Sequence, residues 1–129
     1  MRKVIYTPHG PRPRGVYSQA IVSDGLVFVA GQVAVNPQTN ELELGDIKAE
    51  TRRTLDNLQT ILLAAGSSLR EVVRIGVYLA DLADFDAMNE VFRKYFPEDP
   101  PARTTIGANL PKIKIEIDCI ARVGRGKNR

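Results

Sequence analysis

Two stretches of the chain repeat apolar residues at intervals of three and four, the spacing of one face of an α-helix. The first stripe consists of Ile47, Thr51, Leu55, Leu58, Leu62 and Ala65. Asp46 stands where an N-cap residue is expected, and Gly66 follows as the residue that ends the helix. The second stripe consists of Phe85, Met88, Phe92 and Tyr95, with Phe96 beside it. We expect Asp84 to cap this second helix, and the prolines from Pro97 onward to end it.

Other stretches show the patterns of β-strands. KVIYT (3–7) is a short β-rich run, and Asp24-Gly25 predicts a hairpin turn between two apolar runs. The second of these runs, LVFVAGQVAV (26–35), is apolar at consecutive positions, which is typical of a strand covered on both faces. The stretch 70–82 predicts a further strand. Its expected buried face consists of Val73, Ile75, Val77 and Leu79.

The last strand alternates most regularly. One face carries Ile113, Ile115, Ile117, Cys119 and Ala121, and the other carries Lys114, Glu116, Asp118 and Arg122. The order of elements predicts a single α+β domain over residues 1–129, a mixed sheet with two helices packed on one face. Two helices cover one face only, whereas the 26–35 run indicates cover on both. We therefore expect a second copy of the chain to supply the missing cover, in a homo-oligomer.

Composition and charge narrow the class of protein. The chain has 129 residues, enough to bury a core without disulfides or a structural metal. Its net charge is +3, and much of the positive charge lies at the ends, in PRPRG (11–15) and RVGRGKNR (122–129). Such tails are usually solvated, so a nucleic-acid partner is not favoured. A lone cysteine, no apolar run of membrane-spanning length and no visible signal peptide indicate a cytoplasmic protein with no membrane partner, unless a targeting segment lies outside this sequence.

Several common chemistries lack their residues. Neither a phosphate-binding loop nor a dinucleotide-binding glycine motif occurs. His9 is the only histidine, and it lies in a proline-rich loop where an exposed side chain is expected. Cys119 shares the isoleucine face of the last strand and is expected to be a buried, inert thiol. We predict no metal site.

Arg103 and Glu116 remain as candidate catalytic residues. If 102–108 and 113–121 formed an antiparallel hairpin, Arg103 would lie opposite Asp118 and diagonal to Glu116 on one face. A one-residue slip would separate them. An arginine binds a carboxylate through two parallel hydrogen bonds, and a glutamate can orient a water and accept its proton. The pair would suit hydrolysis of a small carboxylated molecule. The alternative is a surface strip of ion pairs without a function.

The chain resembles the RidA/YjgF family of reactive intermediate deaminases, which act on imines and enamines. The matching stretches are GVYSQA (15–20), VAGQVAVNP (29–37), TLDNLQTILLAAGSSLREVVR (54–74), DFDAMNEVFRKYF (84–96), PPARTTI (100–106) and KIEIDCIA (114–121). They follow the family's order over nearly the whole chain, and PPAR[ST] followed by [IV]E[IV] is the specific signature. The resemblance implies a chorismate-mutase-like fold, a homotrimer, and clefts between subunits for small carboxylated ligands.

The resemblance also implies a reaction and roles for individual residues. The reaction would convert 2-aminoacrylate, 2-iminopropanoate or 2-iminobutanoate to 2-oxo acids and ammonia, with no cofactor. Arg103 would clamp the substrate carboxylate and Glu116 would hold the attacking water. The implied ligand-facing positions are Tyr17, Gly31, Asn89 and Thr105. Two departures are visible: Val16 replaces a proline common before the tyrosine, and Thr105 replaces a common cysteine.

Two other functions remain open on the sequence. The same clefts could bind a small carboxylate as a sensor, without chemistry. Alternatively, the chain could bind RNA or inhibit translation, a role reported for some family members, which here would depend on the basic ends.

Overall fold

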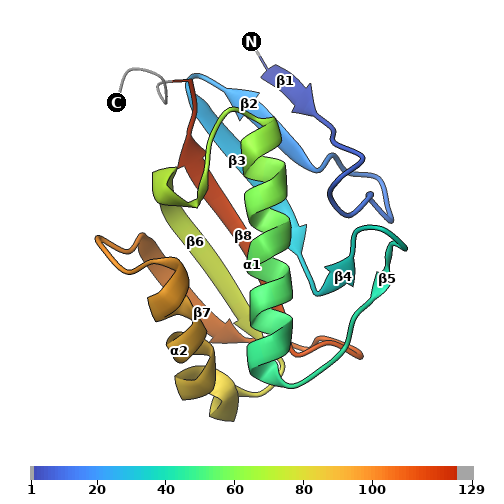
Figure 1. Ribbon diagram of the computed structural model, residues 1–129, viewed down its shortest axis with the longest axis vertical. Helices are drawn as coiled ribbons and strands as arrows, with labels where there is room; N and C mark the ends of the chain where they lie inside the picture. The colour runs from blue at the N-terminus through green and yellow to red at the C-terminus, as the bar shows by residue number, and fades with distance from the viewer. Residues whose placement is uncertain (1, 125–129) are drawn as a thin grey trace.

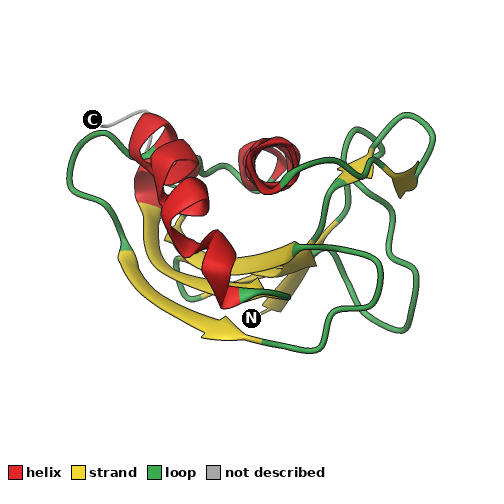
Figure 2. Ribbon diagram, turned by 90° about the horizontal axis from the view of Figure 1, so that it is seen from below, coloured by secondary structure: helices red, strands yellow, loops and turns green. Residues whose placement is uncertain are grey.

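Six strands form one mixed sheet, and two α-helices lie on one of its faces (Figures 1 and 2). The computed structural model describes residues 2–124. The strands of this sheet are β1 (Arg2–Ile5), β2 (Ala20–Ser23), β3 (Leu26–Gln32), β6 (Val72–Leu79), β7 (Ala102–Gly107) and β8 (Ile115–Arg122). Their spatial order is β1-β2-β3-β8-β6-β7, and only β6 and β7 run parallel. The helices are α1 (Ile47–Ala64) and α2 (Phe85–Tyr95). The predicted α+β class is confirmed.

The first helix begins and ends where the sequence indicates. The Asp46 carboxylate accepts a hydrogen bond from the backbone N–H of Ala49 at 2.8 Å, and Gly66 has the positive φ of +82° that glycine tolerates. Asp84 takes the N-cap position of α2 as expected, but its side chain makes no capping hydrogen bond. Asp81 instead caps a short 3-10 helix, Leu82–Asp84, that leads directly into α2. Together the two segments make a longer helical unit than the sequence pattern predicts.

The Asp24-Gly25 hairpin is confirmed, with positive φ at both residues and β2 paired to β3. The run 26–35 is not one strand. β3 ends at Gln32 after a bulge between Val29 and Gln32, and β4 (Val35–Asn36) pairs with β5 (Glu41–Leu42) in a separate small sheet. The bulge adds a residue to β3 and changes which side chains face the helices.

The predicted buried face of β6 is wrong at one position. A bulge between Val72 and Arg74 turns Val72 into the core and leaves Val73 exposed, whereas Ile75, Val77 and Leu79 are buried as expected. On β8, Ile115, Ile117, Cys119 and Ala121 are all buried beneath the helices.

The expected hairpin of residues 102–108 and 113–121 does not form. β8 lies between β3 and β6, and β7 pairs with the far edge of β6, parallel to it, after the chain has crossed through α2. A central position buries the alternating apolar side chains of β8 most completely. The more polar sequence of β7, ARTTIG, suits an edge strand. Arg103 therefore lies beside Ile75 rather than opposite Asp118.

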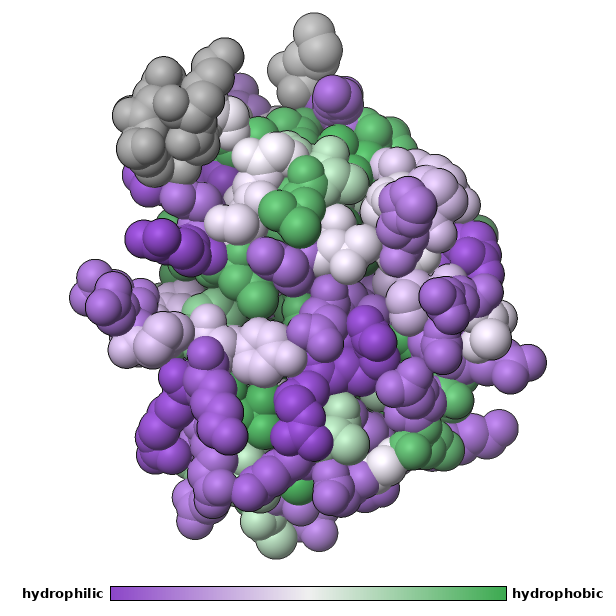
Figure 3. Space-filling model, in the orientation of Figure 1, coloured by the Kyte–Doolittle hydropathy of each residue, from purple (hydrophilic) through white to green (hydrophobic). Residues whose placement is uncertain are grey.

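Residues 2–124 provide no cover for the second face of the sheet (Figure 2). Registered neighbours place Val4, Ile21, Phe28 and Ile120 in one row across four strands of this open face. Val4 is 56% exposed and Phe28 is 41% exposed, although both are large and apolar. The helical face toward the viewer in Figure 3 is by contrast largely hydrophilic, with hydrophobic residues scattered between. No helix within residues 2–124 is long and apolar enough to cross a membrane.

Candidate functional site

Arg103 lies on the helical side of β7, because it is registered beside the fully buried Ile75. Its guanidinium carbon is 5.0 Å from the ring centre of Phe92 and 5.5 Å from that of Phe85, both on α2. One guanidinium nitrogen is 3.9 Å from the Met88 sulfur. Within residues 2–124 no carboxylate pairs with Arg103, and its partial burial lowers its pKa. The chain thus holds a partly desolvated cation against aromatic rings, without an anion.

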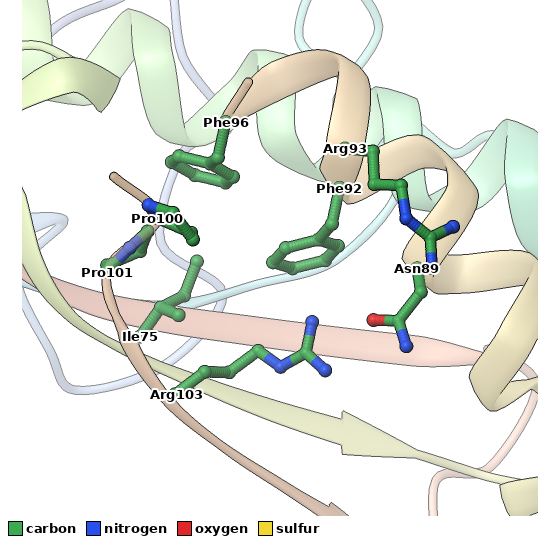
Figure 4. Close-up of a pocket in the computed structure, with 8 residues that line it drawn as sticks. All are labelled: Ile75, Asn89, Phe92, Arg93, Phe96, Pro100, Pro101 and Arg103. Atoms are coloured by element: carbon green, nitrogen blue, oxygen red, sulfur yellow. The ribbon is translucent and has the colours of Figure 1, made fainter. Parts of the chain in front are cut away.

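A cavity of about 420 Å³ opens beside this guanidinium (Figure 4). Its walls are Ile75, Asn89, Phe92, Arg93, Phe96, Pro100, Pro101 and Arg103. Asn89 reaches in from α2 on the same side as the guanidinium, as Figure 4 shows. Thr105 is two residues beyond Arg103 on the same strand face, and its hydroxyl is buried with no hydrogen-bond partner among the described residues. We call Arg103, Asn89 and Thr105 the Arg103 half-site.

Glu116 lies on the open face of the sheet, between the buried Ile115 and Ile117 of β8. Gly31 of β3 is its neighbour, and a Cβ atom on Gly31 would stand only 2.1 Å from Oε2 of Glu116. No described residue donates a hydrogen bond to this carboxylate. Burial, and secondarily the charge of Asp118, raises the pKa of Glu116. This is the state of a carboxylate suited to act as a general base.

Tyr17 is half exposed and lines a small cavity that it shares with Gly31. Its hydroxyl accepts a hydrogen bond from the backbone N–H of Arg14 at 3.1 Å, so the side chain is tied to its own loop. Val16, next to Tyr17 in this loop, points fully into solvent. We call Glu116, Gly31 and Tyr17 the Glu116 half-site.

The start of β8 is fixed by a buried carboxylate. Glu50 on α1 is fully buried and accepts hydrogen bonds from the backbone N–H of Lys114 at 2.9 Å and of Gly45 at 3.2 Å. The Lys114 ammonium lies 3.6 Å from the same carboxylate. Glu50 thereby anchors β8 two residues before Glu116.

The two half-sites do not meet within one chain. Arg103 is registered beside Ile75, which faces the helices, and Glu116 is registered beside Tyr78, which does not. The two side chains therefore project from opposite faces of the sheet. The sequence-based geometry that placed them on one face is wrong, because it depended on the hairpin that does not form.

Sequence reasoning missed the aromatic surroundings of Arg103. The stripe pattern identifies Phe85 and Phe92 only as core positions of a helix, yet both contact the guanidinium. Their seven-residue spacing places them on one helix face. This spacing, together with the candidate cation Arg103 shortly after the helix, was the available signal for an aromatic contact. As expected, Cys119 is buried, and burial raises the pKa of its thiol to about 12. His9 is exposed in its loop. Residues 2–124 contain no cluster of three or more acidic, histidine or cysteine side chains that could hold a metal ion.

Comparisons with known proteins identify the family. Residues 7–123 match the family described as Endoribonuclease L-PSP. A RutC family protein of Pyrococcus horikoshii is 48% identical over 123 residues, which cover 94% of this chain and 98% of that protein. A 2-iminobutanoate/2-iminopropanoate deaminase of Dermatophagoides farinae is 36% identical, covering 92% of this chain and 94% of that protein.

The solved structures agree. The crystal structure of TdcF of E. coli with bound serine superposes with a TM-score of 0.88 at 35% identity, covering 95% of this chain and 99% of that one. The chain therefore belongs to the Endoribonuclease L-PSP family, the YjgF/RidA family, and has its fold. Some relatives in this family are named as deaminases, whereas others carry only a family name.

Proposed function

We propose that the protein is a hydrolytic deaminase of small imines and enamines that carry a carboxylate, such as 2-iminopropanoate, 2-aminoacrylate and 2-iminobutanoate. The observation that most supports this proposal is the state of the Arg103 guanidinium. It is partly desolvated, lacks an anionic partner among residues 2–124 and lines a cavity. A relative that is 36% identical is named as a deaminase of these imines, and a structural neighbour contains bound serine, itself a small carboxylate.

The active site would be completed by a second copy of the chain. Arg103 and Glu116 face opposite ways in one chain, so one substrate can touch both only if they come from different subunits. The uncovered sheet face, with its row from Val4 to Ile120, supports close association of copies. We propose a closed homotrimer, in which every subunit gives its Arg103 half-site to one cleft and its Glu116 half-site to the next.

The proposed reaction needs positioning and one base. Arg103 holds the substrate carboxylate, and the amide of Asn89, which lines the same cavity, is available to the rest of the ligand. Glu116 of the neighbouring subunit takes a proton from a water whose oxygen bonds to the imine carbon. With an imine protonated on nitrogen, this addition gives a neutral amino alcohol. Glu116 then returns the proton to the amino group, the C–N bond breaks, and the hydroxyl proton passes to Glu116 or to water as the C=O bond forms, which releases ammonia and a 2-oxo acid. A positioned base contributes about 10²–10⁴-fold, enough for imines that already hydrolyse in water.

A coupled assay tests this function. A dehydratase generates 2-aminoacrylate in the presence of the protein, and pyruvate formation is followed above the uncatalysed rate. We expect acceleration by the wild type and loss of it in Arg103→Ala. Undiminished activity in Arg103→Ala would rule out the carboxylate clamp. A carboxylate ligand that binds without shortening the lifetime of the imine would instead indicate a sensor.

The family's description as an endoribonuclease makes RNA a second candidate substrate. Part of the basic N-terminal segment is folded onto the protein, because Arg12 hydrogen-bonds to the Pro37 carbonyl at 3.4 Å and Arg14 to that of Asn40. Residues 125–129, which carry the rest of the basic C-terminal tail, lie outside the described residues. Incubation of the same preparation with single-stranded RNA is therefore a second arm of the assay. RNA cleavage without imine hydrolysis would overturn the proposed function.

A further inference from the structure

A second carboxylate accompanies Glu116 on the open face of the sheet. Asp118 lies two residues further along β8, beyond the buried Ile117, and so projects from the same side. Two like charges on neighbouring same-face positions repel each other, and the charge of Asp118 disfavours ionisation of Glu116. A pair of this kind needs a structural reason to persist.

Two glycines make room for the two carboxylates. Gly31 adjoins Glu116, as described above, and Gly76 of β6 adjoins Asp118. A Cβ atom on Gly76 would stand 2.5 Å from Oδ1 of Asp118 and 3.1 Å from the hydroxyl of Tyr78. Any side chain at either glycine would therefore displace its carboxylate, so the paired arrangement is built into three adjacent strands.

Tyr78 binds one member of the pair and leaves the other free. Its Cα is registered opposite Glu116, yet its hydroxyl donates to Oδ2 of Asp118 at 3.0 Å by reaching diagonally past Gly76. The hydrogen bond to Asp118, together with burial, raises the pKa of Tyr78, so the phenol keeps its proton as a donor. Asp118 is fixed as an acceptor, whereas Glu116 receives no hydrogen bond from the described residues.

The other charged groups around Glu116 are directed elsewhere within one chain. The Lys114 ammonium pairs with Glu50, and the guanidinium of Arg74 donates to the backbone carbonyl of Ile75 at 2.8 Å. Arg12 and Arg14, which line the cavity next to Gly31, bind the carbonyls of the 37–40 loop. The remaining neighbours on β3 carry no charge, so Asp118 is the charged group that acts most directly on Glu116.

We propose that Asp118, fixed by Tyr78, is a positioning residue that acts through its charge on Glu116 and lets that carboxyl group exchange a proton with water and with the leaving nitrogen. This inference rests on the proposed function. The attacking water must lose a proton and the nitrogen must later gain one, so a base with a raised pKa serves both steps better than an ordinary carboxylate. The raised pKa of Glu116 agrees with this role, with burial as its larger cause and Asp118 as the second.

The test is the pH profile of kcat/KM for Asp118→Asn, Asp118→Glu and the wild type, each normalised to its own maximum. The amide of Asp118→Asn keeps an acceptor for Tyr78 but removes the charge, so the acid limb moves to lower pH. Asp118→Glu restores the charge and returns the limb toward the wild-type position. A fall in rate with the limb unmoved in Asp118→Asn would show a purely structural role and overturn the proposal.

A direct titration separates this proposal from the proposed function. Carbon-13 NMR of the Glu116 carboxyl group follows its protonation without any turnover, in the wild type and in Asp118→Asn. The proposal requires a lower midpoint in Asp118→Asn, and an equal midpoint in both proteins contradicts it. If the wild type produces no pyruvate above background while the midpoint still moves, the coupling of the two carboxylates holds and the deaminase assignment fails. Tyr78→Phe provides a further control, because it keeps the charge of Asp118 and must not reproduce the downward shift.

Discussion

Gly31 lies so close to Glu116 that a Cβ atom added to the glycine would stand 2.1 Å from the carboxylate oxygen. Van der Waals contact cannot be that short, so the carboxylate would have to move. Because Glu116 sits between two buried isoleucines, its strand cannot shift to relieve the clash, and the side chain itself must rotate away.

Gly31→Ala therefore lowers kcat/KM for imine hydrolysis by about 10²-fold, the usual cost of displacing a catalytic group by about 1 Å. The coupled aminoacrylate assay measures the loss. Gly25→Asn is the matched control, because Gly25 has positive φ, which asparagine tolerates, and no atom lies within 4 Å of the position that a Cβ atom would take there. Equal activity of Gly31→Ala and Gly25→Asn would show that the crowding at Glu116 has no catalytic meaning.

Arg103→Lys keeps a positive charge but loses the planar fork that can bind a carboxylate twice and lie against Phe92 and Phe85. We expect a loss of about tenfold or more in kcat/KM, mainly through a higher KM, since one charge-assisted hydrogen bond is worth about 1.5–3 kcal/mol. Steady-state kinetics with imines of different chain length measure it. Wild-type KM in this variant would contradict the proposed clamp.

Glu116→Gln should stabilise the fold near neutral pH. The pKa of Glu116 is raised in the folded chain, so folding disfavours its charged form. The unfolded chain releases this proton first, and stability falls as the pH rises from the ordinary value of 4.5 through the raised folded pKa. The loss of stability caused by ionising Glu116 is complete above its folded pKa and absent below pH 4.5.

Thermal unfolding of both proteins at about pH 7 and about pH 4 tests this sign. The variant should melt at a higher temperature at the neutral pH only. Lower stability of Glu116→Gln at neutral pH would show that the charged carboxylate makes favourable interactions in the folded protein.

Glu50→Ala should destabilise the fold by about 2–4 kcal/mol, because it leaves the backbone N–H groups of Gly45 and Lys114 without their buried acceptor. Denaturant unfolding measures the difference. The control is Glu43→Ala, an exposed acidic residue of the preceding loop, which should stay within about 0.5 kcal/mol of the wild type. Equal stability of the two variants would mean that water replaces the Glu50 carboxylate at no cost.

Features that depend on nearby residues were predictable from the sequence. The cap at Asp46, the turn at Asp24-Gly25 and the buried face of β8 each follow from a short local pattern. Features that depend on distant partners were not. The position of β7 follows from competition between β8 and β7 for a central place in the sheet, and no pattern within residues 102–121 reveals the outcome.

The same reason explains what was missed at the site. Residue chemistry and the family resemblance singled out Arg103 and Glu116, but the face on which each lies is set by strand order. Likewise, the displacement of Val73 from the core follows from a bulge, which shifts the alternation by one residue without a clear sequence signal. The diagonal hydrogen bond from Tyr78 to Asp118 joins residues 40 positions apart and depends on the pairing of their strands, so it too was invisible in the sequence.

The central claim is that one active site takes Arg103 from one subunit and Glu116 from another. The most direct measurement mixes two inactive proteins, Arg103→Ala and Glu116→Gln, by co-expression or joint refolding, and follows imine hydrolysis. Random association gives about a quarter of the clefts both wild-type residues, the product of two even chances, so about a quarter of wild-type activity should return. Activity that stays at the level of the separate variants, in assemblies shown by mass to contain both chains, would contradict a shared site.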